Sequence, residues 1–557
     1  MKKVVLISGR LTTGKSELAA LLKKEFGYSW MKTSDILREE ALRRGLSNDR
    51  ISLQKLGDAM DTETDGRWVF DAVTRMQAYE IVPIVVDNIR NLTQLEHFRK
   101  NHENFITHVH LYASTKELQR RYEDRAGIDS PDGNYASADL LKNQEDIEFF
   151  KTDADVRINT ARTDHRDTLV RVAARLGLYS PPDVRCVDVL VGGQYGSEGK
   201  GHVAAYLAKD YDVLVRVGGP NAGHTVASAS GLYTYHQLPS GAKDTTAKLL
   251  LGPGMTINVD SLLREISECN VTADRLFIDP QAMVIEASDI VAETEIVGKI
   301  ASTGRGGGAA AARRITARGA SSTRLARDVP ELKEFVGEQY PYRGSTTAHL
   351  EVAYRENLSI LLEGTQGSGL SIFHGPYPHV TSRDTNVAGC LAEAGISPSR
   401  VRRILMVIRP TPIRVGNPDG NAGYSSGGIK HETTWDEIAE SASLDAEEVK
   451  AHEKTSTTRR DRRVGWFEWE QFRNACALNA PTDVVLTFAD YIDAKNQSAR
   501  RFEQLTQDTI KFIEELERIA QAPVSLINTR FPRELHSKID LRTIIDRRNW
   551  SCNKKEP

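Results

Sequence analysis

A glycine-rich loop near the start of the chain has the residues needed to bind phosphate. "GRLTTGKS", Gly9 to Ser16, matches the P-loop pattern G-x-x-x-x-G-K-[ST] between the apolar run "VVLIS" and a helix-like segment from Lys15 to Glu25. In such a loop the backbone N–H groups hold phosphates, the lysine neutralises the outer phosphates and the serine hydroxyl binds Mg²⁺. Gly9, Gly14, Lys15 and Ser16 are therefore predicted to bind a nucleoside triphosphate with Mg²⁺.

Charged side chains follow the P-loop at positions that suit a phosphate acceptor. They occur in "TSDILR", "VVDNIR" and "RRYEDR" as Asp35 with Arg38, Asp87 with Arg90, and Arg121 with Arg125. Each pair alone is typical of a solvated surface. Together with the P-loop they resemble the nucleoside and deoxynucleoside monophosphate kinases over about residues 1–176. The resemblance implies that the Asp35 helix holds the acceptor nucleotide and that Arg121 and Arg125 clamp the transferring phosphoryl group.

A second glycine-rich loop, "VGGQYGSEGKGH" (Val191 to His202), follows the apolar run "VDVLV" but lacks the P-loop spacing. It resembles the signature G-x-Q-[WYF]-G-D-E-G-K-G of the adenylosuccinate synthetases. Further blocks appear in that family's order: "GGPNAGHTV" is similar to "NNAGHT", "STGRGGG" to "TTGRGIG", "LEGTQGSGLSIFHGPYPHVTSRDT" to "FEGAQG…GTYPYVTSSNT", "TSTTRRDRRVGW" to "TTGRRRRTGW", and "LTFAD" to "LTKLD". So many ordered blocks make a chance match very improbable.

The resemblance implies a two-step ligation. A nucleoside triphosphate phosphorylates the 6-oxygen of a purine nucleoside monophosphate, and L-aspartate then displaces that phosphate at C6. The first step needs a base at N1 and an acid or cation for the charge that develops on the transferred group. In the family these are the loop aspartate and the histidine of "AGHT". The histidine is present as His224, but the aspartate is replaced by Ser197.

A serine is no general base unless another group takes its proton, and three explanations for Ser197 remain open. The second region could be a catalytically silent nucleotide sensor, Glu198 could replace the missing base, or the acceptor could differ. We favour a different acceptor, because guanine carries an amino group beside N1 and a small neutral residue leaves room for it. At Ser197 the chain resembles a phage branch that joins aspartate to dGMP, giving 2-amino-2′-deoxyadenylosuccinate. IMP, the acceptor in AMP biosynthesis, is the alternative.

Other roles are implied by the same resemblance. Gly196, Glu198, Gly199, Lys200 and Gly201 should hold the triphosphate, and the Gly223 carbonyl should bind Mg²⁺. Asp490 matches a carboxylate that recognises guanine, but Phe488 replaces the usual lysine, so GTP or ATP remains open. Arg318 should contribute to binding of the acceptor from a neighbouring subunit of a homodimer. The other residues that should bind the acceptor and L-aspartate are Asn221, Thr303, Gln366, Thr381, Thr457, Thr458, Arg460 and Arg462.

Composition and patterning supply the framework for these sites. The chain has 557 residues, with 73 basic against 76 acidic side chains, which gives no indication of a nucleic-acid or membrane partner. Five scattered cysteines indicate a reducing compartment, and we expect a cytoplasmic enzyme. Short apolar strands alternate with helices, which predicts α/β folds with parallel sheets. We expect a P-loop kinase-like domain at 1–176, a linker at 177–184, and a synthetase-like domain with a large, mostly parallel sheet at 185–557.

Overall fold

The computed structural model describes residues 3–79, 82–102, 105–126, 135, 144–228, 231–319, 323–336, 345–417, 425–455, 459–532, 534–535 and 538–551. Two site residues of the sequence analysis, Thr457 and Thr458, lie outside this part, as does the side chain of Arg125. The chain forms two compact units, Met1–Tyr179 and Ser180–Pro557. No described helix combines the length and apolar character that crossing a bilayer requires.

The first unit contains a five-stranded parallel sheet in the order β2-β3-β1-β4-β5. Its strands are β1 (Val4–Gly9), β2 (Ser29–Lys32), β3 (Ile84–Asp87), β4 (Ile106–Tyr112) and β5 (Val156–Asn159). Its named helices are α1 (Lys15–Phe26), α2 (Thr33–Arg43), α3 (Arg50–Thr64), α4 (Arg67–Tyr79), α5 (Leu92–His102), α6 (Thr115–Ala126), α8 (Gln144–Asp153) and α9 (His165–Arg175).

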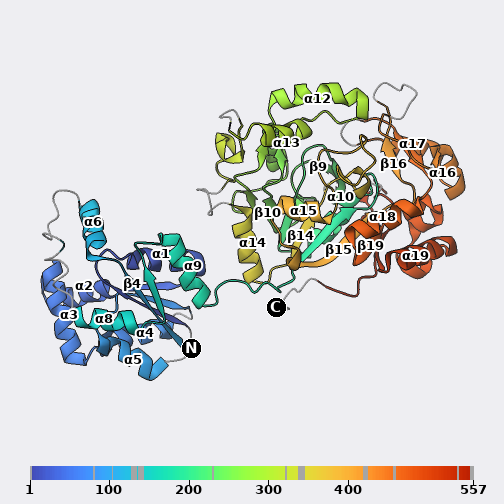
Figure 1. The fold of residues 1–557 in the computed structure, drawn as a ribbon. Helices are drawn as coiled ribbons and strands as arrows, with labels where there is room; N and C mark the ends of the chain where they lie inside the picture. The colour runs from blue at the N-terminus through green and yellow to red at the C-terminus, as the bar shows by residue number, and fades with distance from the viewer. Residues whose placement is uncertain are drawn as a thin grey trace. The chain divides into compact units, whose positions relative to one another are not determined.

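Alternate residues of β1 face opposite sides of this sheet, and each side is covered by helices (Figure 1). Val5 and Ile7 pack in a buried cluster that includes Leu18 of α1 and Leu169 of α9. Leu6 belongs to the cluster on the other side, with residues of α2 to α5 and α8. A strand buried on both faces has the continuous apolar run that the sequence shows here.

The second unit is built on a nine-stranded sheet in the order β12-β10-β7-β14-β6-β15-β19-β20-β23. All strand pairs are parallel except the last, β20 with β23. The strands are β6 (Val187–Gly192), β7 (Val213–Arg216), β10 (Lys248–Leu251), β12 (Leu276–Ile278), β14 (Ile360–Glu363), β15 (Val401–Ile408), β19 (Asp483–Leu486), β20 (Val524–Asn528) and β23 (Ile544–Asp546).

Helices cover both faces of the large sheet as well (Figure 1). One buried cluster joins it to α10 (Lys200–Ala208) and α11 (Val259–Glu268), and the other joins it to α14 (Thr346–Arg355), α15 (Val387–Ala394), α18 (Trp469–Asn479) and α19 (Gln507–Ala520). Loops at the ends of the strands carry α12 (Ala287–Ile300), α13 (Gly307–Thr316), α16 (Trp435–Ala442), α17 (Ala446–His452), the hairpin β8 (His224–Ser228) with β9 (Gly231–Tyr235), and the small antiparallel sheet of β16 (Ile413–Val415), β18 (Arg462–Gly465) and β17 (Glu432–Thr433). The predicted α/β class with parallel sheets is confirmed.

Each glycine-rich loop follows a central strand, one that is paired with another strand on both sides. β1 lies between β3 and β4, and β6 lies between β14 and β15. From β1 the chain continues on one side of the strand and later crosses to the other, and the same holds for β6. The carboxyl end of such a strand opens a crevice between diverging loops, where α/β sheets bind ligands. The topology therefore puts each glycine-rich loop at the place where its sheet is expected to bind a nucleotide.

Candidate phosphate-transfer and ligase sites

In the first unit the P-loop connects β1 to α1. Gly9 has φ 145°, and a Cβ added there would lie 2.3 Å from the Leu111 carbonyl oxygen, so only glycine fits. The Lys15 ammonium donates to the carbonyl oxygens of Gly9 and Arg10 at 3.0 and 2.9 Å. The Ser16 hydroxyl donates to Asp87 Oδ2 at 2.7 Å. This oxygen set suits Mg²⁺, which binds proteins through few ligands and retains water and phosphate oxygens.

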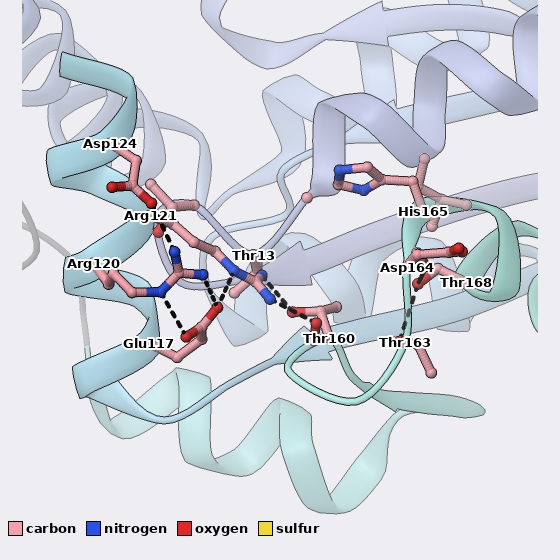
Figure 2. A pocket seen from close by; sticks show the side chains of 13 residues that line it. Thr13, Glu117, Arg120, Arg121, Asp124, Thr160, Thr163, Asp164, His165 and Thr168 are labelled. Atoms are coloured by element: carbon pink, nitrogen blue, oxygen red, sulfur yellow. Dashed lines mark hydrogen bonds and ion pairs between the residues drawn. The ribbon is translucent and has the colours of Figure 1, made fainter. Parts of the chain in front are cut away.

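A cavity of about 350 Å³ adjoins the P-loop. Thr12, Thr13, Gly14 and Leu18 line one side, and α6 and the segment from Thr160 to Thr168 line the rest. Figure 2 shows Arg121 turned toward Glu117 and Thr160. Arg121 donates to Glu117 at 2.8 Å and to the Thr160 hydroxyl and carbonyl at 3.0 and 2.6 Å. The segment from Thr160 to His165 was missed by sequence reasoning, because nothing in its composition marks it as part of a site.

The remaining acceptor residues of this unit are placed on α2 and after β3. Asp35 and Arg38 form an exposed pair at 2.6 Å on α2. Arg90 lies against α3, where a Cβ added to Gly57 would be 2.7 Å from its Nη1 atom. Asp87 is buried at the end of β3. Asp87 therefore reaches the P-loop, whereas Asp35 and Arg38 neutralise each other in this structure.

In the second unit the signature loop connects β6 to α10, and two adjacent residues face opposite ways. Glu198 is completely buried and accepts hydrogen bonds from the backbone N–H groups of Gln194 and Gly196 at 3.1 and 2.7 Å. It also pairs with the Lys200 ammonium at 2.5 Å. Ser197 is exposed, with φ 57°. Glu198 thus holds the loop together from inside, and the interpretation that it replaces the missing base has no geometric support.

Ser197 lies beside a cluster of buried charges. The Glu453 carboxylate joins Arg409 at 2.7 Å to Arg462 at 2.8 Å, and it also accepts from the Tyr491 hydroxyl at 2.7 Å. Burial raises the pKa of Glu453, but the two guanidinium charges outweigh burial and lower it to about 2. Arg462 Nη2 is 3.5 Å from Ser197 Oγ, in donor position. The side chain at position 197 therefore faces an arginine whose charge Glu453 balances.

His224 begins β8 and meets the end of β14. Its Nδ1 atom lies 2.5 Å from Glu363 Oε1, and since a carboxylate only accepts, Nδ1 carries the proton. This fixes the tautomer and leaves Nε2 as the nitrogen for a ligand. Glu363 also accepts from Arg216 at 3.1 Å and from the Ser240 hydroxyl and backbone N–H at 2.5 and 2.7 Å. A Cβ added to Gly201 would lie 2.5 Å from His224 Cβ, so α10 begins directly against the histidine.

The charges around His224 set its resting state. Burial, followed by the Arg216 charge, lowers its pKa to about 4, although Glu363 opposes the shift. Burial raises the pKa of Glu363, but the charges of Arg216 and His224 outweigh burial and lower it to about 2. At neutral pH the pair is a carboxylate and a neutral imidazole. Incoming phosphate charge would favour protonation at Nε2, the state required of an acid. Sequence reasoning missed Glu363, whose signal is a carboxylate at the end of β14.

Several predicted acceptor residues gather around the start of α13 and the loop before it. Among the described residues, Asn221 Oδ1 and Thr303 Oγ1 are buried polar atoms with no hydrogen-bond partner, as expected of groups reserved for a ligand. A Cβ on Gly307 would be 3.4 Å from Asn221 Nδ2. Arg460 Nη1 donates to the Ala301 carbonyl at 3.5 Å, which brings the segment predicted to bind L-aspartate to the loop that contains Thr303.

The other predicted residues come from further segments of the second unit. Gly223 precedes His224 directly, and the Thr381 backbone N–H donates to the Leu370 carbonyl at 2.8 Å. Arg318 is exposed just after α13. Asp490 is buried, and Gln497 donates to its Oδ2 atom at 3.3 Å. Phe488 stacks on Tyr491 with ring centroids 5.6 Å apart.

Comparisons with known proteins agree with this geometry. The family model "Adenylosuccinate synthetase" matches residues 189–339 and 322–497, and an "AAA domain" model matches residues 5–142. The adenylosuccinate synthetase of Methanocaldococcus jannaschii is 33% identical over 363 residues, covering 64% of this chain and 96% of that protein. That of Thermococcus sibiricus is 35% identical over 363 residues, covering 64% and 98%.

Two solved structures are similar to the second unit. The cyanophage S-2L succinoaminodeoxyadenylate synthetase (PurZ), bound to dGMP and to dATP as an energy donor, has a TM-score of 0.51 and 27% identity over 65% of this chain and 95% of that chain. The fully ligated adenylosuccinate synthetase of Plasmodium falciparum has a TM-score of 0.54 and 19% identity over 65% and 100%, a likeness of fold. The chain therefore belongs to the adenylosuccinate synthetase family, and carries a P-loop kinase-like unit ahead of its ligase-type unit.

Proposed function

We propose that the second unit joins L-aspartate to C6 of dGMP at the expense of a nucleoside triphosphate, giving 2-amino-2′-deoxyadenylosuccinate. The observation that carries the proposal is the side chain at position 197. It is a small, neutral, exposed hydroxyl where the family pattern has an aspartate, in a loop whose own carboxylate, Glu198, is turned inward. The S-2L enzyme, whose structure holds dGMP and dATP, supports this choice of acceptor over IMP.

The chemistry follows from the charge that develops at C6. Oxygen is a poor leaving group at that carbon, so the γ-phosphoryl group is transferred to O6 before the aspartate amine attacks. His224, with Nδ1 held by Glu363, presents Nε2 to the transferred group and stabilises its charge once protonated. Arg460 and Arg462 suit a dicarboxylate, because each guanidinium can grip a carboxylate with two hydrogen bonds.

Ser197 cannot take the N1 proton at neutral pH, so it serves as a hydrogen-bonding group at the N1 and C2 edge. Because this residue is exposed, we propose that the N1 proton passes to water as O6 is phosphorylated. Guanine presents both an N1–H and a 2-amino group there. A carboxylate at this position would have to share that edge with the 2-amino group of guanine, whereas hypoxanthine carries only hydrogen at C2. The retained aspartate-binding arginines and the His224–Glu363 pair count against a silent nucleotide sensor, because a sensor has no need of them.

The donor and the metal follow from the surrounding groups. Mg²⁺ would be held by the Gly223 carbonyl and by phosphate oxygens, and there it would neutralise charge on the transferring group. Asp490 and Phe488 stand at the positions that contact the base of the nucleoside triphosphate in the family pattern. Phe488 contributes no charge, and Gln497 donates to Asp490 Oδ2 at 3.3 Å. Because Phe488 replaces the family's lysine and the S-2L structure holds dATP as its energy donor, we favour ATP as the donor over GTP.

For the first unit we propose phosphoryl transfer from a triphosphate to a (deoxy)nucleoside monophosphate. Lys15, the Ser16–Asp87 pair and the adjoining cavity support this activity. We further propose a homodimer, in which the exposed Arg318 reaches the acceptor phosphate of the partner subunit. Release of ADP with a panel of monophosphates, without aspartate, tests the kinase, and sedimentation velocity with and without nucleotide tests the dimer.

The ligase proposal is tested by product analysis. The chain is incubated with L-aspartate, Mg²⁺ and ATP or GTP, and dGMP, GMP, dIMP and IMP are offered in turn. Mass spectrometry then detects the succinylated nucleotide. We expect the highest kcat/KM with dGMP. Product from IMP alone would identify an ordinary adenylosuccinate synthetase, and no product from any acceptor would leave only a nucleotide-binding unit.

Substitutions at position 197 test its role directly. Asp and Asn both tolerate the positive φ of this residue, so Ser197→Asp and Ser197→Asn differ in charge but little in backbone strain. A positioned base contributes roughly 10²–10⁴ in rate. We expect Ser197→Asp to raise kcat/KM for IMP relative to dGMP by about tenfold or more, and Ser197→Asn to leave the ratio near that of the unaltered chain. An equal response to both variants would contradict the proposal.

A further inference from the structure

Beside the signature loop lies a partly buried arginine, Arg383, that contacts one predicted acceptor residue, Gln366. Arg383 binds Glu393 through two parallel hydrogen bonds at 2.7 and 2.8 Å. Its Nη1 atom donates to the Thr365 hydroxyl at 2.8 Å and to Gln366 Oε1 at 3.3 Å. Glu393 also accepts from the Gly218 backbone N–H at 3.0 Å, so the guanidinium is anchored to the main chain near the acceptor segment.

These contacts fix which way the Gln366 carboxamide points. A guanidinium has only donors, so the side-chain atom of Gln366 that faces Arg383 must be the oxygen. The Thr365 hydroxyl receives a hydrogen bond from Arg383, which leaves its own proton to donate to Gln366 Oε1 at 2.8 Å. Two donors therefore hold the same oxygen. The oxygen and the nitrogen of the Gln366 amide can therefore be told apart, because only the oxygen can accept from both donors.

The backbone of Gln366 is held as firmly as its side chain. Its φ is 58°, a left-handed conformation that few non-glycine residues adopt. A Cβ added to Gly192 would lie 2.6 Å from its carbonyl oxygen, and one added to Gly196 would lie 3.6 Å from its Cα atom. Gln366 is thus packed against the signature loop, one residue away from Ser197, with the amide NH₂ group on the side opposite Arg383.

We propose that Arg383, acting with Thr365, is a positioning residue that sets the acceptor specificity of the ligase unit. It fixes the Gln366 amide so that two N–H donors face the C6 edge of the acceptor purine. A 6-oxopurine presents an acceptor there, whereas a 6-aminopurine presents donors, so the site selects the oxo form and rejects a 6-amino nucleotide. The inference rests on the proposed function, because it requires a purine monophosphate beside Ser197.

The sequence pattern agrees with this role. Where the family blocks quoted above have alanine in "FEGAQG" and serine in "VTSSNT", this chain has Thr365 and Arg383. The two departures contact each other and the same glutamine. Neither would hold the amide as well alone, since Thr365 without Arg383 could turn its hydroxyl, and Arg383 without Thr365 would hold the oxygen only at 3.3 Å.

The test is equilibrium binding by calorimetry to the full-length chain, with no aspartate or triphosphate present. The ligands are two matched pairs, dGMP with 2,6-diaminopurine-2′-deoxyribonucleoside monophosphate, and IMP with AMP. The quantity compared is the ratio of the affinities for the oxo and amino members. In a complex with a 6-amino nucleotide the Gln366 NH₂ group and the purine amino group are both donors and leave each other unpaired. We therefore expect the unaltered chain to prefer the oxo form by on the order of tenfold to a hundredfold.

Variants separate positioning from mere stability. Arg383→Met should lower the oxo-to-amino ratio by about tenfold, because the amide can then turn over. Thr365→Ala should lower it severalfold without removing the ion pair between Arg383 and Glu393. In a Gln366→Ala background Arg383→Met should have no further effect on the ratio. Arg402→Met, which removes a guanidinium paired with the Asp188 carboxylate away from this segment, should lower stability and leave the ratio unchanged.

The outcomes are distinct. If the unaltered chain binds neither dGMP nor IMP, the proposed ligase function falls and this inference falls with it. If it binds the oxo nucleotides but the ratio is the same in Arg383→Met and Thr365→Ala, the inference alone is wrong. Should Arg383→Met fail to fold, as judged by circular dichroism, the ratio in Thr365→Ala decides the question.

Discussion

Glu363→Gln is the substitution that tests the ligase site most severely. Four donors converge on this carboxylate: His224 Nδ1, Arg216 Nη1, and the Ser240 hydroxyl and backbone N–H. Glutamine keeps the shape but replaces one oxygen by an NH₂ group, which must then face a donor. It also removes the charge that balances Arg216, a fully buried guanidinium.

Breaking one partner of a buried ion pair costs about 3–5 kcal/mol, and we expect the free energy of unfolding to fall by that amount. Catalysis should fall further. The neutral amide no longer requires the proton on Nδ1, so the tautomer is no longer fixed and the imidazolium is no longer stabilised. Loss of a positioned acid costs roughly 10²–10⁴ in kcat.

Two assays are needed, urea unfolding followed by circular dichroism and the rate of succinylated product against pH. Asp188→Asn is the matched control, because Asp188 is also a fully buried carboxylate, paired with Arg402 and Tyr211 but at the start of β6. It should lose stability and leave the pH profile of the rate unshifted. A Glu363→Gln variant with unaltered stability, rate and pH profile would refute the reasoning.

Three further predictions follow from the same contacts. Lys15→Met should lower ADP release with monophosphates by about a hundredfold, because the phosphates lose their cation, and should leave succinylated product formation unchanged; both rates are measured on one preparation. Gly201→Ala should lower the free energy of unfolding by about 1–3 kcal/mol and reduce ligase activity, since its methyl group would overlap His224 at 2.5 Å; thermal unfolding and product formation check this. Burial lowers the pKa of His108 in the first unit and of His224 in the second to about 4. The unfolded chain then binds more protons between pH 6.5 and 4, so the stability of each unit should fall as pH drops through that window. From pH 7 to 5 the loss should be about 2 kcal/mol per histidine. Equal free energies of unfolding by urea at the two pH values would contradict this.

The regular elements could be predicted from the sequence because their pattern is local. Apolar runs such as "VVLIS" and "VDVLV" become β1 and β6, each buried on both faces. Turn residues after each strand marked the glycine-rich loops, and the α/β class followed from the alternation of strands with helices. Serine at position 197 was equally visible, since a departure from a motif requires no coordinates. The sequence by itself therefore determined the elements, the family and the residue that raises the question of the acceptor.

Only the tertiary structure decided which side chains meet. Glu198 follows Ser197 directly, yet the positive φ of Ser197 turns one side chain outward and the other into the core. His224 and Glu363 are 139 residues apart, and their hydrogen bond forms because the segment that leads from β7 to β8 meets the end of the neighbouring parallel strand β14. Arg383 and Gln366 both lie in the long segment between β14 and α15, and the folding of that segment brings them together. Propensity and periodicity act over a few neighbours, whereas the pairing of buried charges depends on packing between distant segments. For that reason His224 could be named from its motif, but Glu363 and the other groups that position it emerged only from the fold.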